Sequence, residues 1–527
     1  MQRSTVLAGL CVLALAIGLG FFDLGHYPLW DPDEARHSEI AREMVHAAGL
    51  RHLWIPTLEF QPYREKPAPY YWLASATYGL LGESETSARL PSSMMALVTV
   101  VAVYAHAARR LGVVGGLAAG LVLVTQVGWF WLARLGTLDM TFTTWVTLSV
   151  LAGLAWLERP APRRPPWLAY ITLGAATLIK GPLALGLVGA PLLAAAWLTD
   201  PRPRWGEVGA VRGALLVAGI AAVFYLPAAI LDPGYVGHFA HTHLRRLEGT
   251  APHHEPVWFY AAWLPVLALP WTAVLIPAAI GAARHPRERV WLGWAVAVPG
   301  MMSIVSSKLP TYLLPALPPI ALLVGAYAGR WVTDDSTAAE RTGAVVATWT
   351  TALGFVVGAV SAWLVRPAYP VGAARAAVSL ILAVAAALLV WMARGGRLRR
   401  VPAVIALAAI AIHLASVRLL APTVSRLHSD AALAAAMAGY PDAPVIAFDT
   451  QAASLAFYRR RPAGHTGDPA ELGRLAAGSQ PLFVVVGSRR SADVEAALGT
   501  RAHLWITTPR RRLYATIPAP TGTAGTP

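Results

Sequence analysis

The chain has 527 residues, of which 56% are hydrophobic and 13% are charged, and its formal net charge is +15 at pH 7. A soluble globular protein carries about 25% charged residues, so this composition excludes an ordinary soluble protein and indicates a polytopic membrane protein. The single cysteine, Cys11, lies in the first apolar run, which excludes disulfides and argues against thiol chemistry. Most arginines lie in short loops between apolar runs, which favours a role in topology and anionic-lipid contact over nucleic-acid binding.

Thirteen runs are apolar enough to be candidate membrane spans, since a helix needs about 20 apolar residues to cross the hydrocarbon layer. The first run has the length of a signal peptide, but no convincing small-residue cleavage site precedes Tyr27, so we interpret it as a retained span. The runs beside Lys180 are either two short helices or one broken helix. The candidates are residues 5–22, 89–108, 113–132, 138–157, 167–180, 182–198, 212–231, 258–281, 290–305, 311–330, 343–364, 374–393 and 401–420.

Positive charges indicate which loops face the cytoplasm. Arginines recur in alternate loops, such as Arg109 with Arg110 and the segment from Arg394 to Arg400, and we predict that these loops are cytoplasmic. The protein is then a multi-pass protein of the plasma membrane with a cytoplasmic N-terminus. The segments predicted to lie outside are 23–88, 133–137, the residues around Lys180, 232–257, 306–310, 365–373 and, because the number of spans is odd, the tail from about residue 421.

The residues after 420 have a different character. Two β-rich runs, PVIAFDT at 444–450 and PLFVVVGS at 481–488, alternate with helical patterns at 429–438, 468–477 and 491–498, which is typical of a small α/β domain. We therefore predict a transmembrane domain at 1–420, whose outer loop at 23–88 holds interfacial helices, an extracytoplasmic α/β domain at 421–518, and a disordered tail at 519–527.

The first outer loop is dense in acids, bases and aromatic residues. Asp33 precedes the run SEIAREMVHAAG, whose pattern predicts an amphipathic helix at the membrane interface with Asp33 near its positive N-terminal end. For Asp33 alone, a helix-start acid in a solvated loop is the plainer interpretation. Further along, Glu65 and Lys66 precede the aromatic run 70–72. The lysine suits a phosphate as a point charge, whereas the aromatic residues suit a membrane-interface belt.

Two further outer segments place charges at the ends of spans. Asp139 begins an apolar helix, where an acid is costly without a partner or a purpose. A salt bridge with Arg134, a helix cap and a functional role are all open. Lys308 and Tyr312 lie in SSKLPTY at the outer end of another span, where snorkelling is the plainer interpretation for the lysine.

The loop at 238–260 is rich in histidines and arginines. Adjacent arginines suit phosphate oxygens, and histidines and carboxylates are ligands for a divalent metal such as zinc or magnesium. The spacing is not that of a tight metal motif, so the metal is an open alternative. Cations outnumber acids across the outer segments, which suits a phosphate-bearing ligand with one acid left for chemistry. The candidate residues that the predicted topology places on this one membrane face are Asp33, Glu65, Lys66, Asp139, Lys180, Arg245, Arg246, His253, His254, Lys308 and Tyr312.

In this arrangement the chain resembles the polyprenyl-phosphate-dependent GT-C glycosyltransferases, in the group of protein mannosyltransferases and aminoarabinose (lipid A) transferases. The resemblance rests on DEARHSEIAREM, YREKPAPYYWL, RLGTLDM, KGPLAL, the histidine-rich segment ending in HHEPVWFY, and SKLPTYLLP, which occur in family order between residue 27 and about residue 320. It implies a GT-C fold of about thirteen spans with an outer cavity. It also implies inverting transfer of a sugar from a polyprenyl-phosphate donor to an outer acceptor such as lipid A, another envelope glycolipid or a protein hydroxyl.

The resemblance also implies roles for the acids. Asp33 matches the essential acid of the first loop, and Asp139 matches a second acid, so both are candidate catalytic residues. Glu65 matches a residue described as a metal ligand in the aminoarabinose branch, and His253 or His254 is expected to share that metal.

Lys66 matches the lysine that contacts the donor phosphate, and Tyr63 matches the tyrosine of the same loop. His37 stands where the family has a tyrosine, which puts closure of the donor cavity by a tyrosine pair in doubt. The residues expected to bind the substrate are Lys66, Tyr63, Arg245, Arg246, Lys308, Tyr312, Lys180, Arg36 and His37.

On this hypothesis Asp33 orients and deprotonates the acceptor, while cations such as Lys66 stabilise charge on the leaving phosphate. No nucleotide-sugar site is visible, which suits a lipid-linked donor. A flippase or transporter would place charges along a mid-membrane pathway, often with half-repeats. The charges here cluster on one face, and no half-repeat is evident. A non-catalytic lipid-binding protein would tolerate loss of Asp33, and a protein O-mannosyltransferase would differ only in its acceptor.

Overall fold

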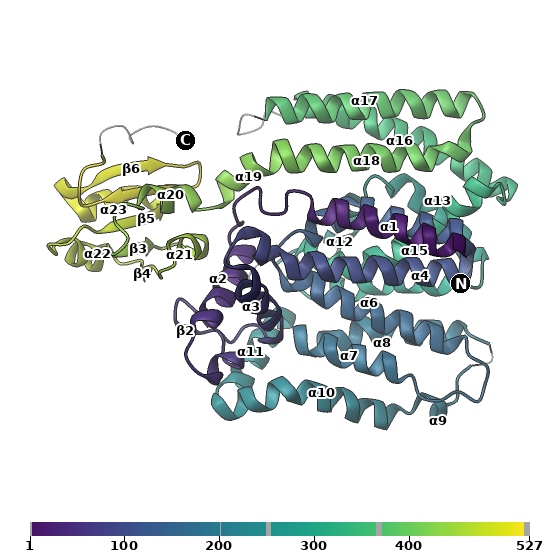
Figure 1. Cartoon of the computed structure of the whole chain (residues 1–527), viewed down its shortest axis with the longest axis horizontal. Coiled ribbons are helices and arrows are strands. Elements are labelled where there is room, and N and C mark those ends of the chain that lie inside the picture. The colour runs from purple at the N-terminus through teal and green to yellow at the C-terminus, as the bar shows by residue number, and fades with distance from the viewer. Residues whose placement is uncertain (1–2, 201, 249–253, 365–370, 521–527) are drawn as a thin grey trace. The chain divides into compact units, whose positions relative to one another are not determined.

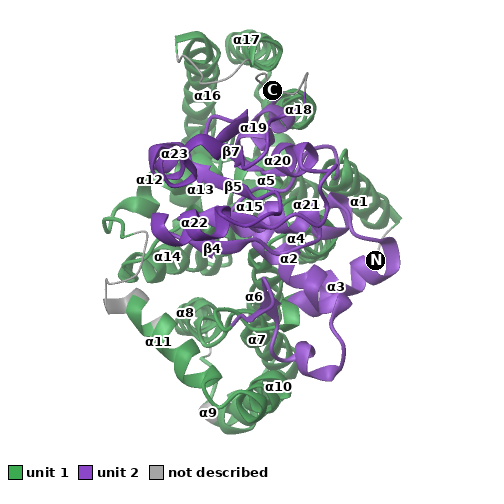
Figure 2. Cartoon of the chain, turned by 90° about the vertical axis from the view of Figure 1, so that its left-hand side faces the viewer, with its two compact units in different colours: residues 1–24, 64–70, 89–419 green, residues 25–63, 71–88, 420–527 purple. Residues whose placement is uncertain are grey.

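The structure is a computed structural model that describes residues 3–200, 202–248, 254–364 and 371–520, apart from the side chains of residues 205, 243 and 246–248. The chain forms two compact units (Figures 1 and 2). Unit 1 comprises residues 1–24, 64–70 and 89–419, and unit 2 comprises residues 25–63, 71–88 and 420–527. Most of the first outer loop therefore groups with the C-terminal residues, whereas the sequence pattern assigns it to the transmembrane part. Of the tail that is expected to be disordered, 519–527, residues 521–527 lie outside the described residues.

Unit 1 consists of helices, most of which are apolar. Its helix α15 is buried on nearly every side, as expected for a helix that is hydrophobic all round. The helices are α1 (Arg3–Phe21), α4 (Glu85–Thr125, in unit 1 from Arg89), α5 (Val127–Ala133), α6 (Leu138–Leu157), α7 (Trp167–Lys180), α8 (Leu183–Leu198), α9 (Trp205–Val208), α10 (Ala210–Leu231), α11 (Tyr235–Glu248), α12 (Phe259–Leu267), α13 (Thr272–Arg284), α14 (Arg289–Ile304), α15 (Leu317–Thr333), α16 (Ala338–Leu364), α17 (Gly372–Arg394) and α18 (Val401–Ala415).

Eight helical segments of the described chain are long and apolar enough to cross a membrane, and counting the bent pair α12–α13 as one span gives up to nine. The pair turns through 106° at its break. The predicted number of thirteen is therefore not established. The difference arises because several predicted runs form short or broken helices. Lys180 ends α7 and Leu183 begins α8, so the pair beside Lys180 is two short apolar helices.

Helix α4 folds back on itself at Gly112, where φ is 76° and the backbone leaves the helical region. In a straight helix, Ala108 and Gly116 would lie about 12 Å apart. A Cβ built on Gly116 would instead lie 2.7 Å from the Cβ of Ala108. The two halves of α4 therefore pack against each other across the turn. This agrees with the sequence pattern, which separates the runs 89–108 and 113–132.

Helices α6 and α14 pack against the short 3₁₀ segment η2 (Pro310–Ala316), and α7 and α8 pack against α6. Helix α6 contacts α7, α8 and η2, and α14 contacts α8 and η2. The first turn of α6, the last residue of α7 and the segment η2 thereby meet in one place. Three of the candidate residues of unit 1, Asp139, Lys180 and Tyr312, lie at this meeting point.

Unit 2 contains a five-stranded sheet in the order β4-β3-β5-β7-β6. Strand β3 pairs in parallel with β4 and β5, and β7 pairs antiparallel with β5 and β6. The runs 444–450 and 481–488 form β3 and β5, which are buried on both faces as parallel strands usually are. The bounds are β3 (Val445–Phe448), β4 (Gly464–Thr466), β5 (Phe483–Gly487), β6 (His503–Thr507) and β7 (Arg511–Ala515), with helices α19 (Ala421–His428), α20 (Ala431–Ala436), α21 (Ala453–Arg459), α22 (Pro469–Ala476) and α23 (Ser491–Leu498).

The first outer loop adds α2 (Asp33–His46), α3 (Pro69–Leu81, in unit 2 from Tyr71) and the hairpin β1 (Thr57–Leu58) and β2 (Gln61–Pro62). Helix α2 packs against α21 of the C-terminal part. A shared core of Ala35 and Ala41 from α2, Tyr78 from α3, and Ala453 and Phe457 from α21 joins these segments. Ten of the fourteen residues of α2 are buried, which differs from the expected helix lying on a membrane surface.

Candidate functional site

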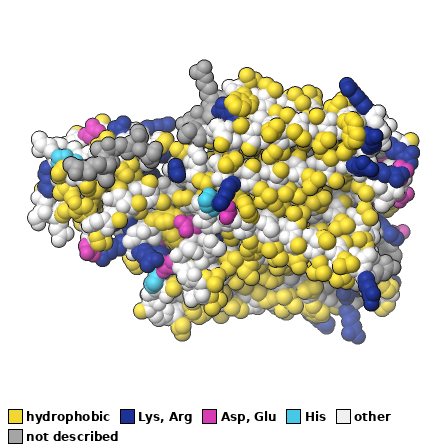
Figure 3. All heavy atoms as spheres, turned by 45° about the horizontal axis from the view of Figure 1, so that its top comes forward, with side chains coloured by type: hydrophobic (Ala, Val, Ile, Leu, Met, Phe, Trp, Pro, Cys, Tyr) yellow, Lys and Arg dark blue, Asp and Glu magenta, His cyan; other side chains and the backbone are white. Residues whose placement is uncertain are grey.

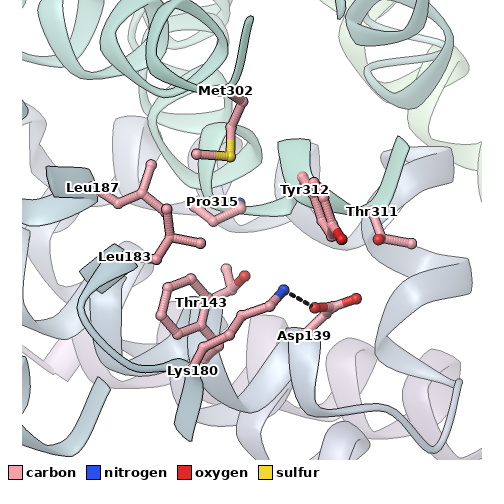
Figure 4. Close-up of a pocket in the computed structure, with 10 residues that line it drawn as sticks. Asp139, Thr143, Lys180, Leu183, Leu187, Met302, Thr311, Tyr312 and Pro315 are labelled. Carbon is pink, nitrogen blue, oxygen red and sulfur yellow. Dashed lines mark hydrogen bonds and ion pairs between the residues drawn. The ribbon is translucent and has the colours of Figure 1, made fainter. Parts of the chain in front are cut away.

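One group of candidate residues in unit 1 contains Asp139 and Lys180. Asp139 lies in the first turn of α6, and Lys180 is the last residue of α7. The Nζ of Lys180 donates a short hydrogen bond to Asp139, and the two side chains are 9% and 18% exposed. Figure 4 shows the pair pointing toward each other beside Tyr312. The acid at the start of this apolar helix therefore has a buried cationic partner, which it needs in such a place.

Lys180 also interacts with aromatic rings. Its Nζ lies 4.7 Å from the ring centroid of Tyr312 and 5.4 Å from that of Phe142, which is within the range of cation–π attraction. The space that remains between these side chains is about 10 Å³, which is room for a single water molecule. A sugar would therefore require the Asp139–Lys180 pair to move. Arg134, the other partner considered for Asp139, donates hydrogen bonds to the carbonyls of Leu19, Gly20 and Phe22 at the end of α1.

Lys308 is buried rather than snorkelling. It is 4% exposed, and its Nζ donates a hydrogen bond of 2.9 Å to the backbone carbonyl of Glu255. The same two segments are joined by the antiparallel bridge between His254 and Ser307. Lys308 therefore links the histidine-rich loop to the segment before η2, and a membrane-interface role is wrong for it.

The loop that carries Glu65 and Lys66 is fixed by a neighbouring ion pair. The Nε of Arg64 donates a hydrogen bond of 2.5 Å to Asp232, which follows α10 and whose side chain is 9% exposed. The buried hydroxyl of Tyr235 also lies 3.4 Å from the backbone carbonyl of Lys66. Asp232 accepts a further hydrogen bond from the N–H of Gly234, as aspartates do in turns. The sequence pattern gave no role to Arg64, Asp232 or Tyr235.

The metal prediction remains open. Glu65 is half-buried and His254 is exposed, and both belong to unit 1. Among the described residues, no three histidine, cysteine or acidic side chains come together as a metal site. His253 lies outside the described residues, as does the side chain of Arg246. Arg245 is an exposed residue of α11.

In unit 2, Asp33 is the first residue of α2 and its side chain is 54% exposed. Its Oδ1 lies 3.3 Å from Arg36 one turn later, so Arg36 holds the carboxylate in a local ion pair. A carboxylate at the first turn of a helix is favoured by the helix dipole. The geometry thus presents a carboxyl group to the surroundings at a fixed point of the loop.

The backbone that precedes Asp33 is anchored to the C-terminal part of unit 2. Ser454, in α21, donates hydrogen bonds from its N–H, at 3.1 Å, and from its hydroxyl to Asp31. The N–H of Asp31 donates to the carbonyl of His428 at 2.7 Å, and Arg511 of β7 lies 3.8 Å from the Asp31 carboxylate. The N–H of Leu29 donates to the hydroxyl of Tyr458 at 2.9 Å. Burial raises the pKa of Asp31, and Arg511 and Ser454 oppose that shift.

His37 belongs to a buried aromatic cluster. Its Nδ1 lies 2.9 Å from the hydroxyl of Tyr71, and the rings of Tyr63 and Tyr71 meet edge to face at 6.3 Å. Tyr71 is fully buried, so a place in a lipid-facing aromatic belt is wrong for this residue. The histidine that departs from the family pattern therefore has a tyrosine hydroxyl as its partner.

A second buried pair lies deeper in α2. Both guanidinium contacts of Arg42 with Glu39 are 2.7 Å long, and the side chains are 6% and 0% exposed. Burial raises the pKa of Glu39, and the hydrogen bond from Arg42 opposes that shift. The i,i+3 spacing of the pair explains how a charged helix face can be buried.

Comparisons with known proteins show what the whole chain is similar to. A profile of the dolichyl-phosphate-mannose-protein mannosyltransferase family matches residues 65–231. Undecaprenyl phosphate-alpha-4-amino-4-deoxy-L-arabinose arabinosyl transferases from Edwardsiella ictaluri and Pseudomonas aeruginosa are 32% and 33% identical to this chain over 337 and 345 residues. Each alignment covers 60% of this chain and 58% of the relative, so the match spans under two thirds of those proteins.

The fold extends over more of the chain than the sequence match. ArnT from Cupriavidus metallidurans bound to undecaprenyl phosphate superposes with a TM-score of 0.79 over 98% of both chains, at 21% identity. The archaeal oligosaccharyltransferase AglB from Archaeoglobus fulgidus gives a TM-score of 0.53 at 11% identity, covering 98% of this chain and 74% of that one.

The helical unit with its charged groups and the accompanying α/β unit together define a membrane protein with the GT-C fold. Over residues 65–231 the chain is similar to the dolichyl-phosphate-mannose-protein mannosyltransferase family, and over 60% of its length it is similar to the aminoarabinose transferases.

Proposed function

We propose that this protein transfers a sugar from a polyprenyl-phosphate donor to lipid A or a similar envelope glycolipid, with aminoarabinose as the first sugar to test. The observation that carries the proposal is the sequence match with aminoarabinose transferases at 32–33% identity, over a fold shared with a structure that holds undecaprenyl phosphate. We further propose that the reaction occurs on the extracytoplasmic side, as the arginine pattern of the loops predicts.

In this proposal Asp33 orients the acceptor nucleophile and removes its proton. The exposed carboxylate, its ion pair with Arg36 and the anchored backbone before it suit a base held at a fixed position. Lys66 binds the donor phosphate, and the Arg64–Asp232 pair positions its loop. Negative charge grows on the leaving phosphate, so a cation held in place stabilises the transition state more than the ground state.

Asp139, Lys180 and Tyr312 form a second polar site in unit 1. Because their cavity is nearly filled by the side chains themselves, we propose that the ion pair rearranges when the sugar part of a substrate enters. A lysine released from its carboxylate would supply a donor to a sugar or phosphate oxygen.

A second candidate is a protein O-mannosyltransferase of the same fold. The match of residues 65–231 with the mannosyltransferase profile favours it. The two candidates differ in the acceptor. Both use a lipid-linked donor and the same base, so the chemistry of the site does not separate them.

A divalent metal remains a proposal for Glu65 with His253 or His254. A carboxylate with histidine is a normal donor set for zinc, although a stable site needs a third ligand. Measuring metal bound per chain in the purified protein and in E65Q tests the ligand role directly. A stoichiometric metal that is lost in E65Q supports the proposal, and equal metal content in both proteins contradicts it.

The function is tested by incubating the purified full chain with synthetic undecaprenyl-phosphate aminoarabinose and either lipid A or a serine- and threonine-rich peptide. Mass spectrometry then detects the acceptor that gains the sugar mass. Sugar on lipid A supports the proposed function, and sugar on the peptide alone supports the mannosyltransferase candidate. Transfer to neither acceptor, with aminoarabinose or mannose donors, contradicts both.

A further inference from the structure

A second cavity, of about 510 Å³, lies in unit 1 away from the Asp139–Lys180 site. Helix α6 carries Asp139 in its first turn and is followed by Glu158, which lines the second cavity. The helical stretch between these two acids is about 28 Å long, close to the thickness of the hydrocarbon layer. Helix α8 connects the two places in the same way, since Leu183 lines the first and Leu198 lines the second. The second cavity therefore lies at the opposite ends of these helices.

This cavity is rich in arginine. Figure 3 shows Lys and Arg side chains gathered at the right-hand end of the helical bundle, beyond a broad band of hydrophobic side chains. The charged residues that line the cavity are Arg110, Arg159, Arg163, Arg287, Glu158 and Asp200. Such a concentration of guanidinium groups suits a phosphate oxygen, which arginine binds through parallel N–H donors.

Arg110 is held rigidly and has donor capacity left. Its side chain is 10% exposed, forms an ion pair with Glu158 and lies 5.6 Å from the ring centroid of Trp291. Its Nε is buried and has no hydrogen-bond partner within the described residues. Because this N–H is shielded by the protein, Arg110 contributes its charge and its fixed position to the cavity wall.

The other arginines divide into two kinds. Arg163 is 3% exposed and is used within the protein, since it donates to Glu207 at 3.1 Å and to the carbonyl of Arg159 at 2.9 Å. Arg159 and Arg287 are exposed, and the described part of the chain offers neither of them an acid within ion-pair distance. These two cations remain available to a ligand.

The remaining wall of the cavity is apolar. Leu154, Leu157, Leu198 and Val290 line it together with the arginines. A free phosphate would leave this apolar surface uncovered, whereas the glycerol and first acyl carbons of a lipid would cover it. The volume also falls within the range of about 300–1,000 Å³ that is usual for small-molecule sites. We propose that this arginine cavity binds the headgroup of an anionic phospholipid.

The proposal is tested with the purified full chain in detergent, titrated with phosphatidylglycerol and, separately, with phosphatidylcholine or inorganic phosphate. Native mass spectrometry counts the bound lipid. The test variant is R159Q/R287Q, which removes the two exposed cations and leaves the buried Arg110 and Arg163 in place. The matched control is R394Q/R400Q, which removes the same charge from another arginine-bearing loop. Thermal unfolding of each variant verifies that it is folded.

We expect phosphatidylglycerol to bind more tightly than phosphatidylcholine, and its affinity to fall about tenfold or more in R159Q/R287Q but less than about twofold in the control. Equal affinity for the two lipids would overturn the proposal, as would equal binding of phosphatidylglycerol by wild type and R159Q/R287Q. If inorganic phosphate displaces the lipid at comparable concentration, the site is one for a free anion and the lipid assignment is wrong.

Discussion

Ser454 donates two hydrogen bonds to Asp31, a residue 423 positions earlier in the chain and two positions before Asp33. The C-terminal part of unit 2 thereby holds the backbone that leads into α2. Arg511 and the carbonyl of His428 add further contacts to Asp31. This relationship suggests that the α/β part of the unit positions the acid of the first loop.

Replacing Ser454 by alanine removes the hydroxyl donor and leaves the N–H in place. A hydrogen bond to a buried charged group contributes roughly 1.5–3 kcal/mol, so we expect a lower unfolding temperature. Because displacement of a reacting group by about 1 Å costs up to roughly a hundredfold in rate, we also expect kcat for sugar transfer to fall tenfold or more, with KM for the donor little changed. Steady-state kinetics well below the unfolding temperature measures both parameters.

The control is S491A, which removes a buried serine hydroxyl from α23 of the same unit. It should lower stability without selective loss of kcat. If S454A and S491A lower the unfolding temperature equally and both retain kcat, Ser454 has only a structural role.

A double-mutant cycle on Asp139 and Lys180 distinguishes a role in stability from a role in function. Removing one partner leaves an unpaired buried charge, so D139N or K180M should each destabilise the protein by about 3–5 kcal/mol. The double variant D139N/K180M should recover much of the stability, because neither charge remains. We expect transfer activity to stay low in all three variants, since both groups belong to the proposed substrate site.

The comparison pair is Glu288 with Arg330, which is also buried in unit 1. E288Q should destabilise the protein while the folded fraction keeps its specific activity. Recovery of both stability and activity in D139N/K180M would show that Asp139 and Lys180 only hold the helices together.

Asp232 positions the loop of Lys66, so D232N should act mainly on donor binding. Loss of the charge weakens the ion pair with Arg64 and leaves Lys66 less well placed for the phosphate. We expect KM for the polyprenyl-phosphate donor to rise several-fold, with a smaller change in kcat. An unchanged KM in D232N, measured with saturating acceptor, would contradict this role.

The contact between His465 of β4 and Glu59 of the β1–β2 turn predicts a pH dependence. The hydrogen bond with Glu59 raises the pKa of His465 above its ordinary value of 6.5. The charged pair therefore stabilises the fold fully below about pH 6.5, and this contribution is lost as the pH rises through the raised pKa. His465 is 42% exposed, so the effect should be under about 1 kcal/mol.

Comparing unfolding temperatures of wild type and H465Q at about pH 5.5 and about pH 8.5 checks this prediction. The difference should be present at the lower pH and absent at the higher one. H503Q, which removes a histidine from β6 of the same sheet, is the control. A difference of equal size at both pH values would exclude the ionised contact.

The sequence pattern located most helices and the strands β3 and β5, because apolar periodicity and β-rich runs are local signals. It missed β6 and β7, whose run HLWITTPRRRLYA is too polar to read as strands. It also placed α2 at a membrane surface, because a helical wheel counts Glu39 and Arg42 as solvated charges although they neutralise each other in the core.

Individual motifs indicated Asp33, Lys66, Asp139 and Lys180 as functional candidates. The supporting contacts were not predictable, since Ser454 meets Asp31 and Arg64 meets Asp232 only after long stretches of chain have folded. The partner of Asp139 was also not predictable from the sequence. Its neighbour Arg134 was considered, whereas Lys180 on the next helix forms the buried pair.

The central claim is that Asp33 acts as the base of a sugar transfer from a polyprenyl-phosphate donor. The most direct measurement compares wild type, D33N and D442N, an exposed acid of the same unit, for sugar transfer and for binding of the lipid donor. We predict that D33N loses transfer by roughly a thousandfold or more while donor affinity stays within about threefold, and that D442N resembles wild type. Near-normal turnover in D33N would contradict the assignment.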